Sequence, residues 1–413
     1  MCPSGTSLNC VACARMMSPS DRFDFVRTTV LTLQADWIDP AKVVKQSLEI
    51  FYIKDTEMKK IIYCASLMAF CACNTYAQSS VTLYGRVASG LDFVTNVATP
   101  NGQSKSNFRF GSDQYGYSWF GLTGDEDLGA GVHAVFKLES LFTSGNGQTP
   151  PNTIFTRDAY VGLSDDKYGS IWFGEAMSLT DETGWYIDPL GEQVGIGVGN
   201  FAFGRAWGPR SNVVTYNSPN WAGFSFRVQD GFGNVAGNFQ SGRQFSVSAQ
   251  YTSTSFAAYG VYEEIRGANG TFPDLYAASR EYMAGATYTL GGVKFYTGFQ
   301  QLVSSGQDTV ATSFNPYAAT RSQQEWIGAS YQATPALAFQ AGWYHGNVNH
   351  GGGEGNLGAI ATTYNLSKRT FLYLTLGAMF NGKNSAFPVE TADSQPLPGH
   401  NQQGGYLGIM HYF

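Results

Sequence analysis

Residues 293–300 read VKFYTGFQ, and neighbouring positions along this stretch alternate in character. In an extended chain one face would carry Val293, Phe295, Thr297 and Phe299, and the other would carry Lys294, Tyr296, Gly298 and Gln300. Residues 337–344 (LAFQAGWY) and 405–413 (GYLGIMHYF) alternate in the same way. Alternation with a period of two, with aromatic side chains near the segment ends, is typical of β-strands. The pattern recurs after residue 78 without helical stripes, so we predict an all-β fold.

The connections between the alternating segments differ in length. Short turns fall at Asp125–Gly131, Asp165–Gly169, Pro219–Gly223, Gly291-Gly292, Ala333–Pro335 and Ser367–Arg369. Long connections fall at 95–107, 176–209, 232–242, 264–279, 302–320, 346–355 and 381–402. The segments between them number sixteen, from near Val81 to Phe413. An even number of antiparallel strands with alternating short and long connections predicts a closed barrel whose short turns face the periplasm.

The apolar face of these segments carries no charge, while the opposite face holds Lys294, Gln300 and Gln340. A soluble sandwich or barrel would bury its apolar face and expose the polar one. A barrel of this width is too wide for side chains to fill, so its interior is wet. Only a closed barrel leaves no unpaired strand edge in hydrocarbon. We therefore expect a 16-stranded antiparallel transmembrane β-barrel, with lipid outside and water inside.

The composition of the chain changes near residue 78. All six cysteines lie before that point, whereas 48 of the 49 glycines lie after it. Just before it, Met58-Lys59-Lys60 precedes the apolar stretch 61–73 (IIYCASLMAFCAC), and small residues follow as far as Ala77. A basic start, a short apolar centre and a small-residue cleavage site form a secretory signal. We predict an upstream extension at 1–57 outside the mature protein, a signal peptide at 58–77 and a barrel domain at 78–413.

The mature region carries 17 Lys and Arg against 24 Asp and Glu, a net charge of -7. This acidic balance argues against nucleic acid as a partner. No apolar run is long enough for a membrane-spanning helix. The run Gly195–Gly199 (GIGVG) lacks the context of a dinucleotide-binding loop, and no catalytic triad or carboxylate pair stands out. We predict no catalytic residues, no cofactor and no metal, and hence no enzyme.

Several blocks of the chain together resemble the trimeric general diffusion porins of Gram-negative bacteria. The blocks are Ser79–Gly85 (SSVTLYG), Gly121–Phe142 (GLTGDEDLGAGVHAVFKLESLF), Arg157–Leu163 (RDAYVGL), Ser211–Phe226 (SNVVTYNSPNWAGFSF) and Tyr406–Phe413 (YLGIMHYF). Each block alone is weak, but together they cover essentially all of 79–413. The resemblance implies a homotrimer in the outer membrane. It also implies that the C-terminal aromatic, Phe413, is the assembly signal read by the outer-membrane assembly machinery.

In this family the third loop folds into the barrel and narrows it, and its acidic residues face basic residues on the wall. The resemblance places this inward-folded loop at about 176–209 and its acidic pair at Asp188 and Glu192. It places the basic side of the constriction at Arg86, Arg157, Arg205 and Arg210. Solvated loop charges are the alternative for the acidic pair. For Arg157, a trimer-interface or turn-facing position is the alternative, because its parity matches the apolar face of its strand.

Two positions depart from the family pattern. Trp119 stands where the second strand usually has an arginine, and Glu175 stands where the fifth strand commonly ends in Gly-Arg. Both departures remove positive charge from the expected constriction. They predict a weak preference for cations, although some family members favour anions.

Together these expectations describe a water-filled channel for passive diffusion of small hydrophilic solutes and ions across the outer membrane. Outer-membrane lipid and lipopolysaccharide would surround it. Selectivity would arise from the width of the constriction and the field between its opposed charges. The alternatives are a channel specific for one anion or sugar, an outer-membrane enzyme, and an adhesive barrel without conductance.

Overall fold

A computed structural model describes residues 80–191, 193–199, 205, 207–305, 311, 317–390 and 394–413. The chain divides into two units, Met1–Thr75 and Tyr76–Phe413, and every described residue belongs to the second. The extension at 1–57 and the signal peptide at 58–77 lie outside the described residues, so both stay predictions.

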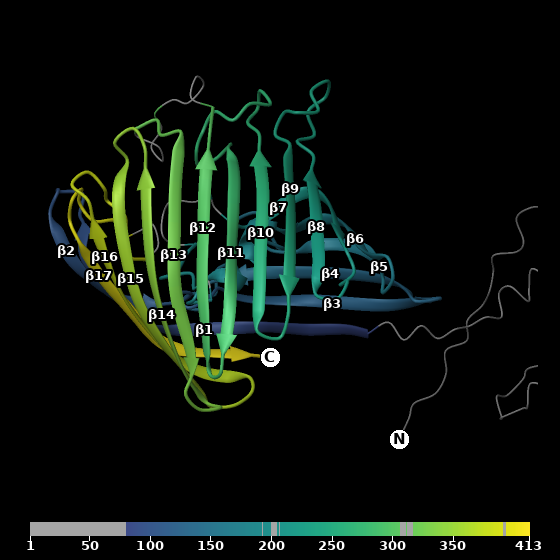
Figure 1. The fold of residues 1–413 in the computed structure, drawn as a ribbon, viewed down its shortest axis with the longest axis horizontal. Helices are drawn as coiled ribbons and strands as arrows, with labels where there is room; N and C mark the ends of the chain where they lie inside the picture. The colour runs from purple at the N-terminus through teal and green to yellow at the C-terminus, as the bar shows by residue number, and fades with distance from the viewer. Residues whose placement is uncertain are drawn as a thin grey trace, which may run out of the picture. The chain divides into compact units, whose positions relative to one another are not determined.

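Antiparallel strands build nearly all of the described fold (Figure 1). They are β1 (Ser80–Ala98), β2 (Ser104–Gly111), β3 (Ser118–Gly129), β4 (Val132–Phe142), β5 (Ala159–Asp165), β6 (Gly169–Met177), β7 (Pro209–Asn217), β8 (Phe224–Gly231), β9 (Gln244–Thr252), β10 (Phe256–Ile265), β11 (Arg280–Leu290), β12 (Val293–Val303), β13 (Arg321–Gln332), β14 (Leu337–Val348), β15 (Gly353–Asn365), β16 (Thr370–Asn381) and β17 (Gln402–Tyr412). A single helix, α3 (Leu179–Ile187), lies between β6 and β7 in the described part of the chain. No helix among the described residues is long and apolar enough to cross a membrane.

The sheet closes on itself. Each strand from β3 to β17 pairs antiparallel with the next, and β17 pairs with β1. The backbones of Gly85 and Phe413 exchange hydrogen bonds of 3.1 and 3.3 Å. In Figure 1 the C-terminus accordingly lies beside β1. The barrel therefore has no open edge among its described strands.

The seventeen labelled strands fill sixteen positions around the barrel. The long strand β1 pairs with β3 over Ser80–Arg86 and with β2 over Gly90–Ala98, on the same side. Residues 112–117 separate β2 from β3. The predicted 16-stranded barrel is therefore confirmed, although its second position is interrupted.

Several predicted connections are shorter in the structure than the sequence pattern suggests. The turn expected at Asp125–Gly131 is only residues 130–131, because β3 continues to Gly129. The loop expected at 95–107 is only residues 99–103. There a register shift after Val94, with Asn96 at a φ of 53°, lets β1 continue pairing past the irregularity.

The two faces of the strands differ as predicted. On β12, Phe295 and Phe299 are exposed while Gln300 is buried, and on β14, Trp343 is exposed while Tyr344 is buried. Buried polar side chains on the inward face include Asp92, Glu139, Thr215, Gln229, Glu263, Glu281, Gln300, Gln324, Thr375 and Gln402. An apolar outside and a polar inside are what a membrane barrel requires.

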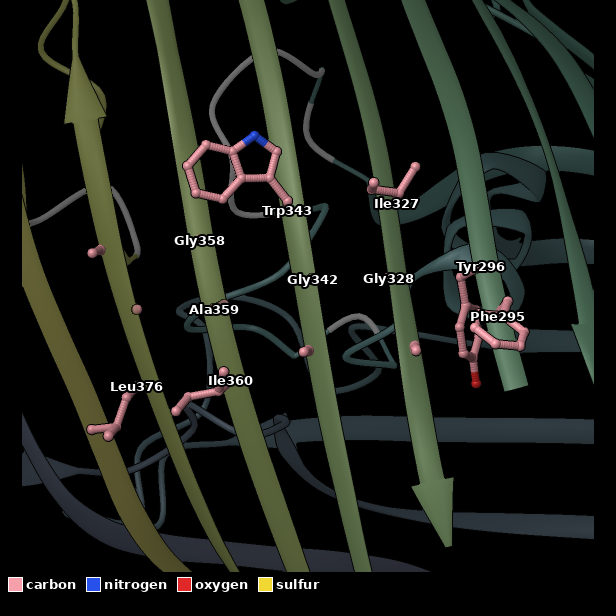
Figure 2. A pocket seen from close by; sticks show the side chains of 14 residues that line it. Phe295, Tyr296, Ile327, Gly328, Gly342, Trp343, Gly358, Ala359, Ile360 and Leu376 are labelled. Carbon is pink, nitrogen blue, oxygen red and sulfur yellow. The ribbon is translucent and has the colours of Figure 1, made fainter. Parts of the chain in front are cut away.

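A shallow hollow crosses the outward face over β12–β16. Figure 2 shows Phe295, Ile327, Trp343, Ile360 and Leu376 around it. Its lining contains no charged side chain. The hollow therefore belongs to the lipid-facing surface and not to a path for hydrophilic solutes.

Candidate functional site

The segment between β6 and β7, residues 178–208, starts with α3. The side-chain oxygen of Ser178 accepts a hydrogen bond of 3.2 Å from the backbone N–H of Asp181, which caps the helix. Asp181 and Glu182 lie in the first turn, where negative charge is favoured by the helix dipole. The helix side that includes Leu179 and Ile187 is buried, and α3 contacts β9–β12. The helix therefore lies against the inner wall.

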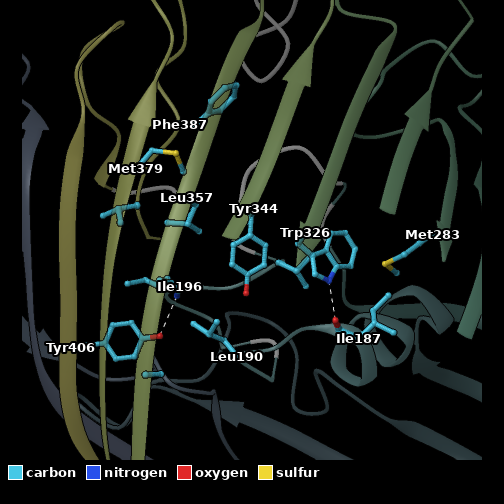
Figure 3. Close-up of a cluster of buried hydrophobic side chains, with 14 of the residues drawn as sticks. Ile187, Leu190, Ile196, Met283, Trp326, Tyr344, Leu357, Met379, Phe387 and Tyr406 are labelled. Atoms are coloured by element: carbon cyan, nitrogen blue, oxygen red, sulfur yellow. Dashed lines mark hydrogen bonds between the residues drawn. The ribbon is translucent and has the colours of Figure 1, made fainter. Parts of the chain in front are cut away.

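Beyond α3 the chain follows the inner wall toward β17 (Figure 3). Nε1 of Trp326, on β13, donates a hydrogen bond of 2.9 Å to the carbonyl oxygen of Ile187. The hydroxyl of Tyr406, on β17, accepts one of 3.2 Å from the backbone N–H of Ile196. The same hydroxyl donates to Oε1 of Gln193 at 2.5 Å. The third loop therefore folds inside the barrel, as predicted.

Glycines on the inner wall make room for this loop. A Cβ added at Gly285 would lie 2.8 Å from Cδ1 of Ile187, and one at Gly377 would lie 3.0 Å from Cδ1 of Ile196. The glycine track, defined as the inner-wall positions where an added Cβ would lie within 3.0 Å of this loop's side chains, comprises Gly285, Gly328, Gly342 and Gly377. These positions let the loop approach the wall more closely than any side chain would allow.

Asp188, expected as a constriction carboxylate, follows α3 and is only 1% exposed. It accepts hydrogen bonds from the hydroxyl of Tyr344 at 2.5 Å and from the backbone N–H groups of Leu190 and Val198 at 3.2 Å. Its charge therefore holds the loop against β14 rather than facing water. Glu192, its expected partner, lies outside the described residues.

Arg205 and Arg210 lie in one buried cluster with two glutamates. Nη2 of Arg205 is 2.6 Å from Oε2 of Glu263 and 3.1 Å from Oε2 of Glu281. Nε of Arg210 lies 3.0 Å from Oε1 of Glu263. Buried charges are tolerated when they are paired and hydrogen-bonded in this way. The cluster adds little net charge to the pore.

Another part of the wall brings together Arg86, Trp119 and Arg157. Trp119 is the register partner of Arg86, and the guanidinium carbon of Arg157 lies 5.6 Å from the centre of the Trp119 ring. Nε of Arg157 donates to Glu139 at 2.9 Å, and Nε of Arg86 donates to the carbonyl oxygen of Tyr117 at 2.8 Å. Both arginines therefore lie on the inward side.

The structure does not bring Glu175 to this group. Glu175 pairs in register with Ala159 and shares its parity with the exposed Phe173. Its carboxylate accepts a hydrogen bond of 2.6 Å from the hydroxyl of Ser211. Because alternate residues of a strand point to opposite faces, Glu175 lies on the outward face and outside the lumen wall.

Three further charged residues of the wall, Lys137, Glu139 and Asp158, were not predicted from the sequence. Nζ of Lys137 lies 2.8 Å from Oδ2 of Asp158 and 3.1 Å from Oε1 of Glu139. Together with Arg157, this group contains two cations and two anions. The signal was present in the sequence, because Lys137 and Glu139 are two residues apart on one strand and so share a face.

The pore-facing side of α3 was also missed. We call Asp181, Glu182, Trp185 and Tyr186 the α3 pore face. These four lie opposite the buried side of the helix, and Glu182 forms an ion pair with Arg227 of β8. Ser178 followed three residues later by Asp181 is a helix-start pattern, and it could have located this helix inside the loop.

A second segment, residues 382–401, contributes one carboxylate to the interior. Glu390 and Asp92 are both buried, and Arg109 contacts both. Burial, followed by the negative charge of Asp92, raises the pKa of Glu390 above the usual range. Arg109 thus joins this segment to β1 through its contacts with Asp92 and Glu390.

A closed membrane barrel with a polar interior, narrowed by an inward loop, fits one known family. The family described as Gram-negative porin matches residues 64–384. The chain belongs to the Gram-negative porin family.

Relatives of this porin extend along most of its length. It is 28% identical over 402 residues to an outer membrane porin protein of Bordetella pertussis, covering 86% of this chain and 100% of the relative. The solved anion-selective porin from Comamonas acidovorans superposes with a TM-score of 0.67 at 23% identity, covering 81% of this chain and 100% of that one. An outer membrane protein of Vibrio cholerae in its trimer form superposes with a TM-score of 0.58 at 13% identity, covering 81% and 99%.

These matches confirm the resemblance read from the sequence blocks. The porin is a protein of the Gram-negative outer membrane. Its family and relatives are channels.

Proposed function

We propose that this porin forms a water-filled channel for passive diffusion of small hydrophilic solutes and ions. The observation that carries the proposal is the α3 pore face, which stands inside a closed barrel with a polar inward surface. The third loop narrows the path, and solutes cross it by passive diffusion. Solutes would be sorted by the width left beside this loop and by the charges that line it.

We propose a weak preference for cations. The cations of the wall form ion pairs with carboxylates. Lys137 and Arg157 pair with Glu139 and Asp158, and Arg205 and Arg210 pair with Glu263 and Glu281. The loop carries Asp181 and Glu182 on its pore-facing side, where Glu182 pairs with Arg227. The net charge of -7 in the mature region acts in the same direction, but charges beyond about 8–10 Å are screened.

Anion preference is the second candidate. It is supported by the solved anion-selective porin from Comamonas acidovorans, whose fold this chain shares. Arg86 and Lys294 also lie on the inward side without a carboxylate partner within 4 Å among the described residues. A channel specific for one anion or sugar would use the same barrel and would show saturable block by that solute.

The test is the zero-current potential across a planar bilayer in a salt gradient, with protein expressed from the full chain and purified from outer membranes. We expect the zero-current potential to have the sign of a channel that prefers cations. Asp181→Asn with Glu182→Gln should shift the permeability ratio toward anions by about twofold or more, because a unit charge at about 4 Å is worth roughly 4 kcal/mol before screening.

The matched control is Asp125→Asn with Glu126→Gln, an adjacent acidic pair on β3 near the periplasmic turn. It should leave the potential unchanged. Anion preference in the unmodified channel, or a double variant of α3 that behaves like this control, would overturn the cation proposal.

We further propose that the working unit is a homotrimer, as in the trimer form of the Vibrio cholerae outer membrane protein whose fold this chain shares. Outer-membrane lipid and lipopolysaccharide would contact the apolar outward face. The constriction would include Arg86, Trp119, Arg157, Arg205 and Arg210 on the wall. Asp188 would act by positioning the loop, and Glu192 would lie in the same loop.

A further inference from the structure

Two arginines lie side by side at one rim of the barrel. Residues 291–292 form the short turn between β11 and β12, and short turns mark the periplasmic end of such barrels. The opposite end, at the top of Figure 1, is therefore the extracellular rim. There Arg280 of β11 and Arg321 of β13 are both register partners of Val303 of β12. Their backbones are thus two strands, or about 10 Å, apart.

Strand parity places both arginines on the outward face. Arg280 shares its parity with the exposed Tyr282, and Arg321 shares its parity with the exposed Ile327. Charged side chains are costly in the apolar band of a membrane barrel and are tolerated near its edges. The two guanidinium groups therefore lie at the level of the lipid headgroups, outside the lumen.

Arg280 is held in place by a buried ring. Its guanidinium carbon lies 3.8 Å from the centre of the Phe272 ring, which is 3% exposed. The guanidinium carbon of Arg266 lies 4.7 Å from the same centre. A planar guanidinium group fixed by a ring loses less freedom when it binds a ligand. The ring thus prepares Arg280 for binding.

One carboxylate lies among these cations. Glu264 is the register partner of Arg280, but its Oε1 accepts from Nη2 of Arg266 at 2.8 Å and its Oε2 accepts from the hydroxyl of Tyr262 at 2.9 Å. Among the described residues, neither Arg280 nor Arg321 has a carboxylate within 4 Å. We call Arg266, Arg280, Arg321 and Glu264 the rim cluster. Three cations and one anion give it a net charge of +2.

The outward face next to the rim cluster is polar but uncharged. Nε2 of Gln323 donates to Oε1 of Gln301 at 3.3 Å, and both residues have outward parity. The next carboxylate along β13 is Glu325, four residues or about 13 Å from Arg321. That separation exceeds the screening distance of about 8–10 Å, so Glu325 does not cancel the charge of the rim cluster.

These groups narrow the chemistry of the ligand. Guanidinium groups bind phosphate through paired hydrogen bonds, and amides both donate to and accept from hydroxyl groups. A phospholipid headgroup offers phosphate without a sugar ring. A phosphorylated saccharide carried on acyl chains matches the arginines, the amides and the apolar face below them at once.

We propose that the rim cluster binds the phosphorylated sugar headgroup of lipopolysaccharide, with Arg280 and Arg321 contacting phosphate and Gln301 and Gln323 contacting hydroxyl groups. This inference rests on the proposed outer-membrane channel and names a binding site for a partner of its outward surface. The bound headgroup would join β11 to β13 across β12, so it should raise the resistance of the barrel to heat.

The test measures the temperature at which the barrel unfolds, with porin expressed from the full chain, purified from outer membranes and freed of lipid in detergent. Three additives are titrated: lipopolysaccharide, lipopolysaccharide with its phosphates removed, and phosphatidylglycerol. We expect intact lipopolysaccharide to raise this temperature at the lowest concentration. Arg280→Gln with Arg321→Gln should raise the concentration required by about tenfold or more, because it removes both charged phosphate donors.

The matched control is Lys368→Gln with Arg369→Gln, which removes two cations from the periplasmic turn between β15 and β16. It should respond to lipopolysaccharide like the unmodified porin. An equal effect of phosphatidylglycerol or of the dephosphorylated form would overturn the inference, as would an unchanged response of the folded Arg280 and Arg321 variant. Planar-bilayer current is recorded from the same preparations. A porin that conducts but does not respond to lipopolysaccharide contradicts this inference alone, whereas absence of conductance contradicts the proposed function.

Discussion

Single side chains decide whether the third loop stays against the wall. Asp188 is the clearest case, because one buried carboxylate serves the hydroxyl of Tyr344 and two backbone N–H groups of the loop itself. Hydrogen bonds to an ionised acceptor are about twice as strong as neutral ones. The residue joins the loop to β14 at the point where α3 ends.

We predict that Asp188→Asn loosens the loop while the barrel still assembles. The side chain of Asp188→Asn would place an NH2 donor where a carboxylate oxygen now accepts hydrogen bonds. At least one of the present donors would lose its acceptor, at a cost of about 1–3 kcal/mol. Single-channel recordings should show larger current fluctuations than the unmodified channel. Tyr344→Phe should produce a similar change, and the double variant should be less than additive because the two residues share one contact.

Asp274→Asn is the control for this prediction. Asp274 also accepts backbone hydrogen bonds, from the N–H groups of Tyr276 and Ala277, but it lies in the loop between β10 and β11. Its substitution should leave the current noise unchanged. Unchanged current fluctuations in Asp188→Asn would show that the carboxylate does not hold the loop.

Strand parity agrees with the position of Arg86 in the structure but not with that of Arg157, which precedes β5 and bonds to Glu139. The inward position of Arg86 follows from its alternation with Val81, Leu83 and Val87. Glu175 was expected in the constriction from family position alone, whereas its own parity with Phe173 places it outside. The burial of Asp188 could not be read locally, because Tyr344 lies more than 150 residues away.

At the scale of elements, the third loop and the strands beneath it are fitted to each other. The glycine track crosses β11, β13, β14 and β16 and receives successive side chains of the loop. A glycine within a strand weakens it, and commonly marks a close approach of another backbone. The glycine track therefore weakens the strands somewhat but allows the loop to dock against them.

We predict that Gly377→Val displaces the far end of the loop. An added Cβ would lie 3.0 Å from Ile196 and 3.1 Å from Val389, and overpacking of this kind costs about 1–3 kcal/mol. Single-channel conductance should fall, because a loop displaced from the inner wall moves further into the lumen. Gly260→Val, at an outward position of β10 where the nearest atom is 3.9 Å away, should leave conductance unchanged, and equal behaviour of the two variants would exclude the track as a docking surface.

The strands themselves were predictable because their signal is local. Alternation over 293–300 needs only eight consecutive residues, and from Phe295 onward it matches the burial of β12. The break between β2 and β3 carried no such signal. Residues 112–117 leave the strand to contact distant groups: the carbonyl oxygen of Gln114 accepts from the backbone N–H of Gly195, and Tyr115 stacks on Tyr373.

At the scale of the whole molecule, closure depends on the pairing of the two ends of the barrel. Strand β17 pairs with β1 from Val94 to Arg86, and Phe413 adds two backbone hydrogen bonds with Gly85. Without this pairing of β1 with β17, which we call the seam, both strands would present unpaired edges to hydrocarbon, where each unsatisfied backbone group costs several kcal/mol. The last residue thus has a structural role in addition to the proposed role as an assembly signal.

Deleting Phe413 should reduce insertion into the outer membrane, because it removes both the backbone bonds to Gly85 and the ring of Phe413. Phe413→Ala keeps the backbone bonds and removes only the ring, so it should also lower insertion if the ring is the assembly signal. Tyr412→Ala, which leaves the terminal aromatic in place, is the control and should insert normally. The measurement is the fraction of heat-modifiable, protease-resistant oligomer in outer-membrane fractions. Normal oligomers from the deletion would contradict both roles, whereas normal insertion of Phe413→Ala alone would leave the backbone bonds to Gly85 as the role of this residue.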